Sequence, residues 1–491
     1  MDAGLWQQLQ ALAPALLATF QLLLAAVVSA HVILHKRDVR AAIGWLGLIW
    51  LVPLAGSVLY ALFGINRIRR RASGLKAHRS PLRPDARHAA AAPASVPCGG
   101  QQLRDAAPPQ PLPALARLMD RVAGMPLVHG NHILPLAGGV AAYAAMLHAI
   151  ETANRTLALS TYIFDADATG RRFVDALAAA AHRGVAVRVL IDGVGGRYSR
   201  PLVLTLLRER GVTAVEFLPS LFPLSLHYAN LRNHRKILVA DGRIGFTGGM
   251  NIRQGHCLDE GRDAIDDIQF ELHGPVVGHL MDTFADDWAF ASGELLSGED
   301  WFPRLPAAGP VTARGIAAGP DEAAERIRWA ILGALSEARQ RVRIVTPYFL
   351  PDATLSTALN LATLRGIALD IVLPARNNLR LMQWASWAKL ARFLIHGCRV
   401  WLTPPPFDHG KLMTVDGAWS LIGSANWDPR SLRLNFELNV EAYDVSFASK
   451  LDDLIDARIA RARPVTLDDV ERRPLAFKLR DGAAWLLSPY L

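Results

Sequence analysis

Cysteine is scarce in this chain: only Cys98, Cys257 and Cys398 occur among its 491 residues. They lie far apart, and no two of them have the short spacing of zinc-binding or redox motifs. The sequence therefore argues against a zinc cluster and a disulfide framework, and it is compatible with a reducing compartment.

Excess charge is also scarce over most of the chain. The formal net charge is +9, and residues 1–87 carry +8 of it, so residues 88–491 are close to neutral. Nucleic-acid-binding proteins concentrate positive charge around the binding site. We therefore expect no nucleic-acid partner, and a membrane-tethered nuclease or phosphodiesterase is the least favoured function. The basic residues cluster in 65–87, where they suit an anionic membrane surface.

Charged residues are absent from two long apolar segments, residues 11–34 and 41–64. Each reaches the ~20 residues needed to cross about 30 Å of hydrocarbon, so we predict a two-helix transmembrane hairpin with a basic juxtamembrane segment over residues 1–71. A cleaved signal peptide would carry a basic start, whereas the first charge here is Asp2. The larger basic excess follows the second segment, which predicts that everything after residue 65 is cytoplasmic.

The remainder of the chain reads as a linker and an internal repeat. Residues 72–115 are rich in proline and alanine, as in flexible linkers. Residues 156–193 and 341–375 then show the same order of apolar strand, loop, amphipathic helix and second strand. Tyr162 and Tyr348 occupy matching places at the ends of the first strands. We predict an α/β fold with a largely parallel sheet, built from two halves, 116–300 and 301–491, related by a pseudo-twofold axis.

Each predicted half contains the same polar motif. The stretches "NHRKILVADGRIGFTGGMN" (233–251) and "DHGKLMTVDGAWSLIGSAN" (408–426) share the spacing H-x-K-x4-D-x6-G-[GS]-x-N. One such match would mean little, but two copies inside matching repeats indicate two half-sites that face each other. The motif residues are His234, Lys236, Asp241 and Asn251 in the first copy and His409, Lys411, Asp416 and Asn426 in the second.

These residue types suit phosphoryl chemistry without a metal or cofactor. On a strand, residues two apart share a face, so each histidine should lie beside its lysine. One imidazole can attack phosphorus while the other acts as acid and base, with lysines and asparagines holding the phosphate oxygens. The two aspartates of the motif join the candidate catalytic set, although their places at strand ends also predict turn or ion-pair contacts.

Two further carboxylates are predicted to orient the histidines. Asp267 lies 33 residues after His234, and Glu437 lies 28 residues after His409, each opening a similar strand-like segment. A catalytic histidine needs its second ring nitrogen anchored, usually by such a carboxylate. Asp263 is the alternative in the first half.

The duplicated motif resembles the mark of the phospholipase D superfamily. The stretches "TPYFLPD", "GSANWDPRSLRLNFE" and "GWLGLIWLVPLAGSVLYALFG" are similar to those of bacterial cardiolipin synthases, and the resemblance covers nearly the whole chain apart from the linker. It implies two phospholipase D-like α/β/α halves and a multi-pass protein of the bacterial inner membrane. It also implies transfer of a phosphatidyl group from one phosphatidylglycerol to another through a phosphohistidine, with His234 as nucleophile and His409 as acid and base.

The resemblance leaves alternatives open. A hydrolytic phospholipase D that releases phosphatidic acid would carry the same motifs, and a non-catalytic lipid-binding protein would not need two intact sets. The reverse roles of the histidines, the acceptor lipid and the oligomeric state are not decided by the sequence. The segment 253–267 departs from the family by being more acidic and less aromatic, which bears on lipid choice.

Overall fold

The computed structural model describes residues 3–36, 39–64, 111–219, 231–258, 261, 263–320, 323 and 325–488. The chain divides into an N-terminal unit, whose described part is residues 3–64, and a larger unit that holds both predicted halves. The basic segment 65–71 and the predicted linker up to residue 110 lie outside the described residues.

The N-terminal unit contains one helix long and apolar enough to cross a membrane. This is α1 (Ala3–His35), whose stretch Leu12–His35 has a mean hydropathy of 2.1. The second predicted span is interrupted: α2 (Val39–Leu51) ends before Pro53, and α3 (Pro53–Leu59) and a π-helical turn (Tyr60–Gly64) follow. Proline cannot donate the helical hydrogen bond and its ring clashes with the preceding turn, which explains the break. The predicted hairpin of two continuous spans is therefore confirmed only in part.

The chain nevertheless reverses direction after α1. Ala25 and Val32 of α1 pack with Ile49 of α2 and with Tyr60, and His31 Nδ1 lies 2.9 Å from the Tyr60 hydroxyl. Helices are suited to an apolar surrounding because their backbone N–H and C=O groups form hydrogen bonds within the helix.

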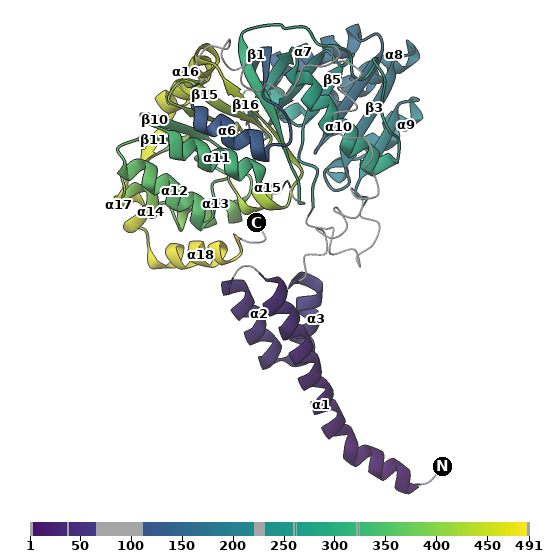
Figure 1. The fold of residues 1–491 in the computed structure, drawn as a ribbon, viewed down its shortest axis with the longest axis vertical. Helices are drawn as coiled ribbons and strands as arrows, with labels where there is room; N and C mark the ends of the chain where they lie inside the picture. The colour runs from purple at the N-terminus through teal and green to yellow at the C-terminus, as the bar shows by residue number, and fades with distance from the viewer. Residues whose placement is uncertain are drawn as a thin grey trace, which may run out of the picture. The chain divides into compact units, whose positions relative to one another are not determined.

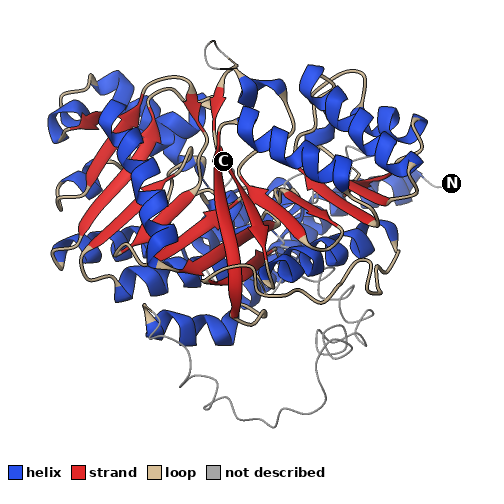
Figure 2. Cartoon of the chain, turned by 90° about the horizontal axis from the view of Figure 1, so that it is seen from above, coloured by secondary structure: helices blue, strands red, loops and turns tan. Residues whose placement is uncertain are grey.

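The larger unit is built on one 15-stranded sheet with helices on both of its faces (Figure 2). Its order is β17-β12-β11-β10-β14-β15-β16-β9-β1-β8-β6-β5-β2-β3-β4. The first half supplies β1 (Val128–Ala137), β2 (Thr156–Thr161), β3 (Ala186–Asp192), β4 (Thr213–Phe217), β5 (Ile237–Ala240), β6 (Ile244–Gly248) and β8 (Ile268–His273). The second half supplies β9 (Val311–Ala318), β10 (Arg341–Val345), β11 (Ala368–Pro374), β12 (Arg399–Thr403), β14 (Leu412–Val415), β15 (Trp419–Gly423), β16 (Glu437–Tyr443) and β17 (Arg463–Val465). A separate pair joins β7 (Ile265–Asp266) to β13 (Phe407–Asp408).

The order of the strands shows the repeat directly. Counting outward from the central β1–β9 pair, β8, β6, β5, β2, β3 and β4 match β16, β15, β14, β10, β11 and β12, and β17 is added at one edge. The two halves thus continue one sheet, and their inner strands share a hydrophobic core that includes Phe270, Leu272, Val440 and Phe447. A site built between the halves is therefore held by a continuous packed layer.

The expectation of a largely parallel sheet is wrong. Within the described sheet, only β2–β3–β4 and β10–β11–β12 are parallel, while the nine inner pairings from β2–β5 across to β14–β10 are antiparallel. The reason is local: β5–β6 and β14–β15 are hairpins closed by Asp241-Gly242 and Asp416-Gly417, all with positive φ. Asp-Gly with two positive φ angles is the preferred chemistry of a tight hairpin turn, which forces antiparallel pairing.

The helices cover the sheet in matching positions. The first half carries α7 (Gly139–Thr152), α8 (Ala168–His182), α9 (Val203–Glu209) and α10 (Val276–Ser292), with 3-10 turns at Gly195–Arg197 and Gln254–Cys257. The second half carries α11 (Arg326–Glu337), α12 (Ala353–Leu364), α13 (Arg380–Trp387), α14 (Ala391–Leu394), α15 (Pro429–Arg433), α16 (Val445–Arg461), α17 (Leu467–Glu471) and α18 (Leu475–Leu486) (Figure 1).

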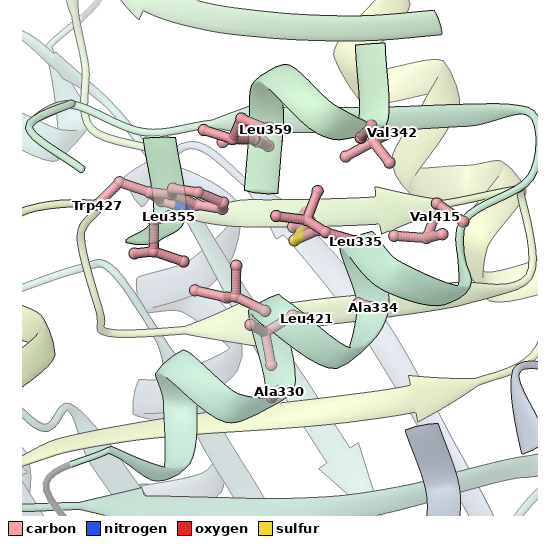
Figure 3. Packing of buried hydrophobic residues seen from close by; sticks show 14 of the residues in the cluster. Ala330, Ala334, Leu335, Val342, Leu355, Leu359, Val415, Leu421 and Trp427 are labelled. Carbon is pink, nitrogen blue, oxygen red and sulfur yellow. The ribbon is translucent and has the colours of Figure 1, made fainter. Parts of the chain in front are cut away.

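The core of the second half shows why α11 packs closely on the sheet. Ala330 and Ala334 face the strands, so the small side chains allow a short helix–sheet distance, while Leu335 and Leu421 fill the layer beside them (Figure 3). The first described helix of this unit, α6 (Pro113–Val122), buries Leu115, Ala116 and Met119 in the same cluster. Residues 113–122 therefore pack on the second half, although their sequence position assigned them partly to the linker and partly to the first half.

Candidate active site

Each histidine of the repeated motif lies at the entrance of a central strand with its lysine beside it. Lys236 Nζ donates to the His234 carbonyl oxygen at 2.8 Å, and Lys411 Nζ donates to the His409 carbonyl oxygen at 2.7 Å. All four side chains are buried. The expected sharing of a face by residues i and i+2 thus brings each pair together.

Two short backbone bridges connect the histidine segments across the halves. The His234 N–H donates to the Phe436 carbonyl at 2.9 Å, and the His409 N–H donates to the Asp266 carbonyl at 2.7 Å. Phe436 and Asp266 immediately precede Glu437 and Asp267 in the sequence. The same bridge in both directions therefore delivers a carboxylate from each half to the histidine of the other.

The carboxylates complete a crossed arrangement. His234 Nδ1 lies 3.1 Å from Glu437 Oε2, and His409 Nδ1 lies 2.7 Å from Asp267 Oδ2. The sequence singled out both carboxylates, counted along the chain from the histidine of the same half, and the structure places each against the histidine of the other half. Asp263, the alternative, is exposed. An Nδ1–H that donates to a carboxylate leaves Nε2 with its lone pair free for chemistry.

The two carboxylates differ in their surroundings. Glu437 accepts from the Ser424 hydroxyl at 2.5 Å and from Asn435 Nδ2 at 3.1 Å. Gly249 occupies the position that matches Ser424. There is no room for a side chain there, because a Cβ would lie 2.4 Å from Asp267 Oδ1. Burial opposes the charge of Glu437, but His234 and Lys236 outweigh it and lower its pKa, whereas burial raises the pKa of Asp267.

Burial weakens the hold of the lysines and histidines of the site on their protons. Burial lowers the pKa of Lys236 to about 7 and that of Lys411 to about 8. Burial also lowers the pKa of both histidines, and Lys411 and Lys236 lower that of His409 further. A phosphate between these groups would remove their mutual repulsion, so the arrangement favours an anionic ligand.

The two asparagines also lie at this site, with different engagements. Asn251 Oδ1 accepts from the Ile163 N–H at 3.1 Å, which leaves its amide N–H group available. Asn426 Nδ2 donates to Ser431 Oγ at 3.2 Å, and the buried Asn426 Oδ1 has no hydrogen-bond partner among the described residues. Turning the Asn426 amide over would let Ser431 donate to Oδ1 and would present the amide N–H group to a ligand.

Asp241 and Asp416, although part of the motif, lie outside the site. Asp241 directly follows β5 and Asp416 directly follows β14, so each aspartate lies at the end of its strand that is farther from the lysine. Asp241 accepts from the backbone N–H groups of residues 154–156, and Asp416 accepts from those of residues 339–341. The inclusion of these two aspartates among the catalytic residues is therefore not supported by their position, whereas the predicted turn contacts are present.

The structure adds aromatic and basic side chains to the site. The Tyr162 ring centroid lies 5.2 Å from that of His234, and the Tyr348 ring centroid lies 6.4 Å from that of His409. The two tyrosines hold matching positions in the repeat, and each lies beside the histidine of its own half. His256 was not singled out by the sequence. Its ring lies 6.5 Å from that of His409, and its two nitrogens are buried with no hydrogen-bond partner in the described part of the chain. Burial lowers its pKa to about 3. A lone histidine in a segment of unusual composition carries no signal by itself, so only the fold could identify it.

Within the described part of the chain, no group of three histidine, cysteine or acidic side chains is placed to hold a metal ion. The expectation that the reaction needs no metal stays a prediction. Asp266, one of the acidic residues near the site, forms ion pairs with Arg458 and Arg461.

The paired half-sites and the symmetric sheet define a duplicated phospholipase D-like fold. The family model described as cardiolipin synthase, PLD-like domain, matches residues 146–288 and 331–459, and the one described as phospholipase D-nuclease N-terminal matches residues 23–64. The crystal structure of phosphatidylserine synthase from Haemophilus influenzae has the same fold, with a TM-score of 0.57 and 14% identity over 77% of this chain and 100% of that chain.

Two curated relatives match nearly from end to end. Cardiolipin synthase A of Pseudomonas fluorescens is 31% identical over 481 residues, 95% of this chain and 96% of the relative. The major cardiolipin synthase ClsA of Bacillus subtilis is 31% identical over 472 residues, 93% of this chain and 95% of the relative. The chain belongs to the cardiolipin synthase family, and it is a membrane-associated enzyme of the phospholipase D superfamily that acts on phospholipids.

Proposed function

We propose that this enzyme joins two phosphatidylglycerol molecules into cardiolipin and releases glycerol. The observation that carries the proposal is the crossed pair of histidines, each with a carboxylate of the other half on Nδ1 and a lysine at its side. The names of the full-length relatives supply the reaction.

In the first step, His234 Nε2 attacks the phosphorus of one phosphatidylglycerol. The bond from phosphorus to the headgroup glycerol oxygen breaks, and His409 supplies the proton that the leaving alkoxide needs. Glu437, whose pKa is lowered by His234 and Lys236, stays ionised and balances the imidazolium charge that develops on His234.

In the second step, the free glycerol hydroxyl of another phosphatidylglycerol loses its proton to His409 and its oxygen attacks phosphorus. The phosphorus–nitrogen bond to His234 breaks, and cardiolipin is released. Lys236, Lys411, Asn251 and Asn426 hold the phosphate oxygens throughout, in place of a divalent metal.

Transfer to lipid must compete with water at roughly 55 M. Well-oriented groups reach effective molarities of about 10⁵ M or more, so a lipid hydroxyl held beside the phosphohistidine can win. The alternative is hydrolysis to phosphatidic acid, with water in the second step. The burial of both histidines favours transfer, because a closed site limits the access of water.

The test uses the full chain in proteoliposomes that contain phosphatidylglycerol labelled in the headgroup, without added metal. We expect cardiolipin and glycerol in equal amounts, no product from His409→Ala, and normal product from His396→Ala, a matched change at an exposed histidine of the same half. Phosphatidic acid with glycerol would make the enzyme a hydrolase, and turnover by His409→Ala would contradict the mechanism.

We further propose that the N-terminal unit is a multi-pass anchor in the bacterial inner (cytoplasmic) membrane and that the catalytic unit is cytoplasmic. The apolar length of α1, the packing of α1 on α2 and the basic segment 65–87 support this arrangement. A thiol reagent that does not cross membranes should label Cys98 in lysed cells and not in intact spheroplasts. Labelling in intact spheroplasts would place the catalytic unit on the other side.

A further inference from the structure

Helix α18 carries an apolar stripe that points away from the protein. Leu475, Leu479 and Leu486 are 71%, 65% and 70% exposed, and their spacing of four and seven residues places them on one helix face. The opposite face holds Asp481 and Ala484, which are buried against the unit. A surface helix normally turns its apolar side chains inward. The exposed leucines of α18 make no such packing contribution, because the opposite face of the helix is the one that packs on the unit.

The neighbouring helix also exposes apolar side chains. α18 packs on α13 (Figure 1). Leu379 and Leu381, at the start of α13, are 51% and 43% exposed. Several large apolar side chains exposed on two helices in contact indicate an interaction site rather than ordinary surface variation.

Between the two helices, basic side chains are stacked on tryptophans. Arg480 lies 4.4 Å from the Trp384 ring centroid, Arg473 lies 4.6 Å from that of Trp387, and Lys389 lies 3.4 Å from that of Trp485. The first two pairs line a hollow of about 370 Å³. Residues 379–394 and 463–488 contain eight basic and four acidic side chains. Tryptophans and snorkelling cations beside leucines are typical of a helix at a membrane–water interface.

We propose that α18 and the start of α13 dock on an anionic phospholipid bilayer, with the leucine stripe among the acyl chains and the basic side chains at the headgroup phosphates. A lipid bilayer is favoured over a second copy of the chain as the occupant. The protein surface combines an apolar stripe with an excess of basic side chains, and a symmetric dimer would have to bury these like charges against one another. The membrane-spanning α1 also keeps the chain at a bilayer.

The docking surface is connected to the site by packing. Trp384, Trp485 and Met382 lie in one cluster with Tyr348, whose ring is 6.4 Å from that of His409. The Tyr348 hydroxyl donates to Asn378 Oδ1 at 2.8 Å, and Asn378 directly precedes the exposed Leu379. A bilayer held by α18 would therefore lie on the side of the unit where Tyr348 and the His409 half-site are packed, so docking would bring lipid substrate near this half-site. This last link rests on the proposed function, whereas the docking itself does not.

The test measures contact with lipid directly. The full-length His409→Ala chain, which separates docking from turnover, is placed in nanodiscs of phosphatidylglycerol and phosphatidylethanolamine that contain a phospholipid with a photoreactive acyl chain. We expect crosslinks in 475–486 and none in α12, where Leu361 and Leu364 are 56% and 66% exposed and serve as the matched control. Equal labelling of the two helices, or none in α18, would overturn the proposal. An interchain disulfide in Leu479→Cys without lipid labelling would show that a second copy covers the surface instead.

A variant sharpens the result. Leu475→Ser/Leu479→Ser/Leu486→Ser changes only exposed side chains, so the fold should persist, and we expect about tenfold less labelling of α18. In the otherwise unaltered enzyme, the triple variant should lose lipid turnover in vesicles but keep it with short-chain, soluble phosphatidylglycerol. Leu361→Ser/Leu364→Ser should change neither. Equal loss with both substrates would assign the leucines a structural role and reject docking.

Discussion

The two half-sites use the same backbone bridge but different side chains around it. His234 faces Glu437, which Ser424 and Asn435 hold in place, while His409 faces the shorter Asp267 beside Gly249. The longer carboxylate has a lowered pKa and the shorter one a raised pKa. The difference teaches that a duplicated fold can supply two histidines of unequal basicity, as a nucleophile and an acid–base pair require.

The largest expected effect separates the roles of the histidines. His234→Ala should abolish every step. His409→Ala should block turnover of phosphatidylglycerol but still form the phosphohistidine from a phosphatidyl ester of p-nitrophenol, a leaving group that needs no proton. Release of p-nitrophenol with a covalent lipid adduct, measured by intact-protein mass spectrometry, checks this. An adduct in His234→Ala instead would reverse the two roles.

The next effect tests the crossed pairing of carboxylates. Glu437→Gln should lower kcat by about 10²–10³-fold, because the histidine loses the charge that holds and stabilises it. Asp267→Asn should act in the same direction. If Glu437 works through His234, Glu437→Gln should lower p-nitrophenol release by His409→Ala, a background in which only the His234 half-site acts. Unchanged p-nitrophenol release in that background would contradict the cross-half partnership.

Exchanging the small residues should affect the halves unequally. Gly249→Ser should lower kcat by roughly 10–100-fold, because its Cβ would collide with the Asp267 carboxylate that His409 contacts. Ser424→Gly removes a hydrogen bond to Glu437 and should cost about 1 kcal/mol, or roughly fivefold in kcat. Steady-state kinetics of both variants provide the comparison, and equal effects would show that the asymmetry is incidental.

The pH dependence should reflect the lysines more than the histidines. Lys236 and Lys411 have pKa values of about 7 and about 8, so they lose the charge that holds phosphate as the pH rises through this range. Burial lowers the pKa of the nucleophile His234, so the acid limb, along which this histidine takes up a proton, lies below pH 6.5. We therefore expect kcat/KM to fall above pH 7–8 by up to tenfold per unit, and Lys236→Arg to move this limb upward. An alkaline limb unchanged by Lys236→Arg would assign it to another group.

The smallest effect on catalysis is expected at the motif aspartates. Asp241→Asn and Asp416→Asn weaken the contacts that tie the two hairpin turns to the backbone of residues 154–156 and 339–341, and should lower stability by about 1 kcal/mol while leaving kcat within twofold. Thermal unfolding and kinetics of the same preparations check both. A loss of kcat beyond tenfold in correctly folded protein would return these residues to the catalytic set.

Much of the site could be predicted because its motifs are local. The alternation of a strand places His234 beside Lys236 and His409 beside Lys411 whatever surrounds them, and the repeat implies that the two pairs meet. The apolar length of α1 likewise follows from composition alone. The break at Pro53 also follows from the local sequence, since proline interrupts a helix in any context.

The sequence by itself determined the duplicated fold, the repeated histidine–lysine motif and the family, because these depend on spacing within one strand, one turn or one repeat. Only the tertiary structure decided which carboxylate serves which histidine, that His256 lies beside His409, and that α18 turns its leucines outward. These features depend on backbone bridges and packing between segments far apart along the chain, such as His234 with Phe436. No local pattern encodes such contacts, because their geometry is set by the whole sheet.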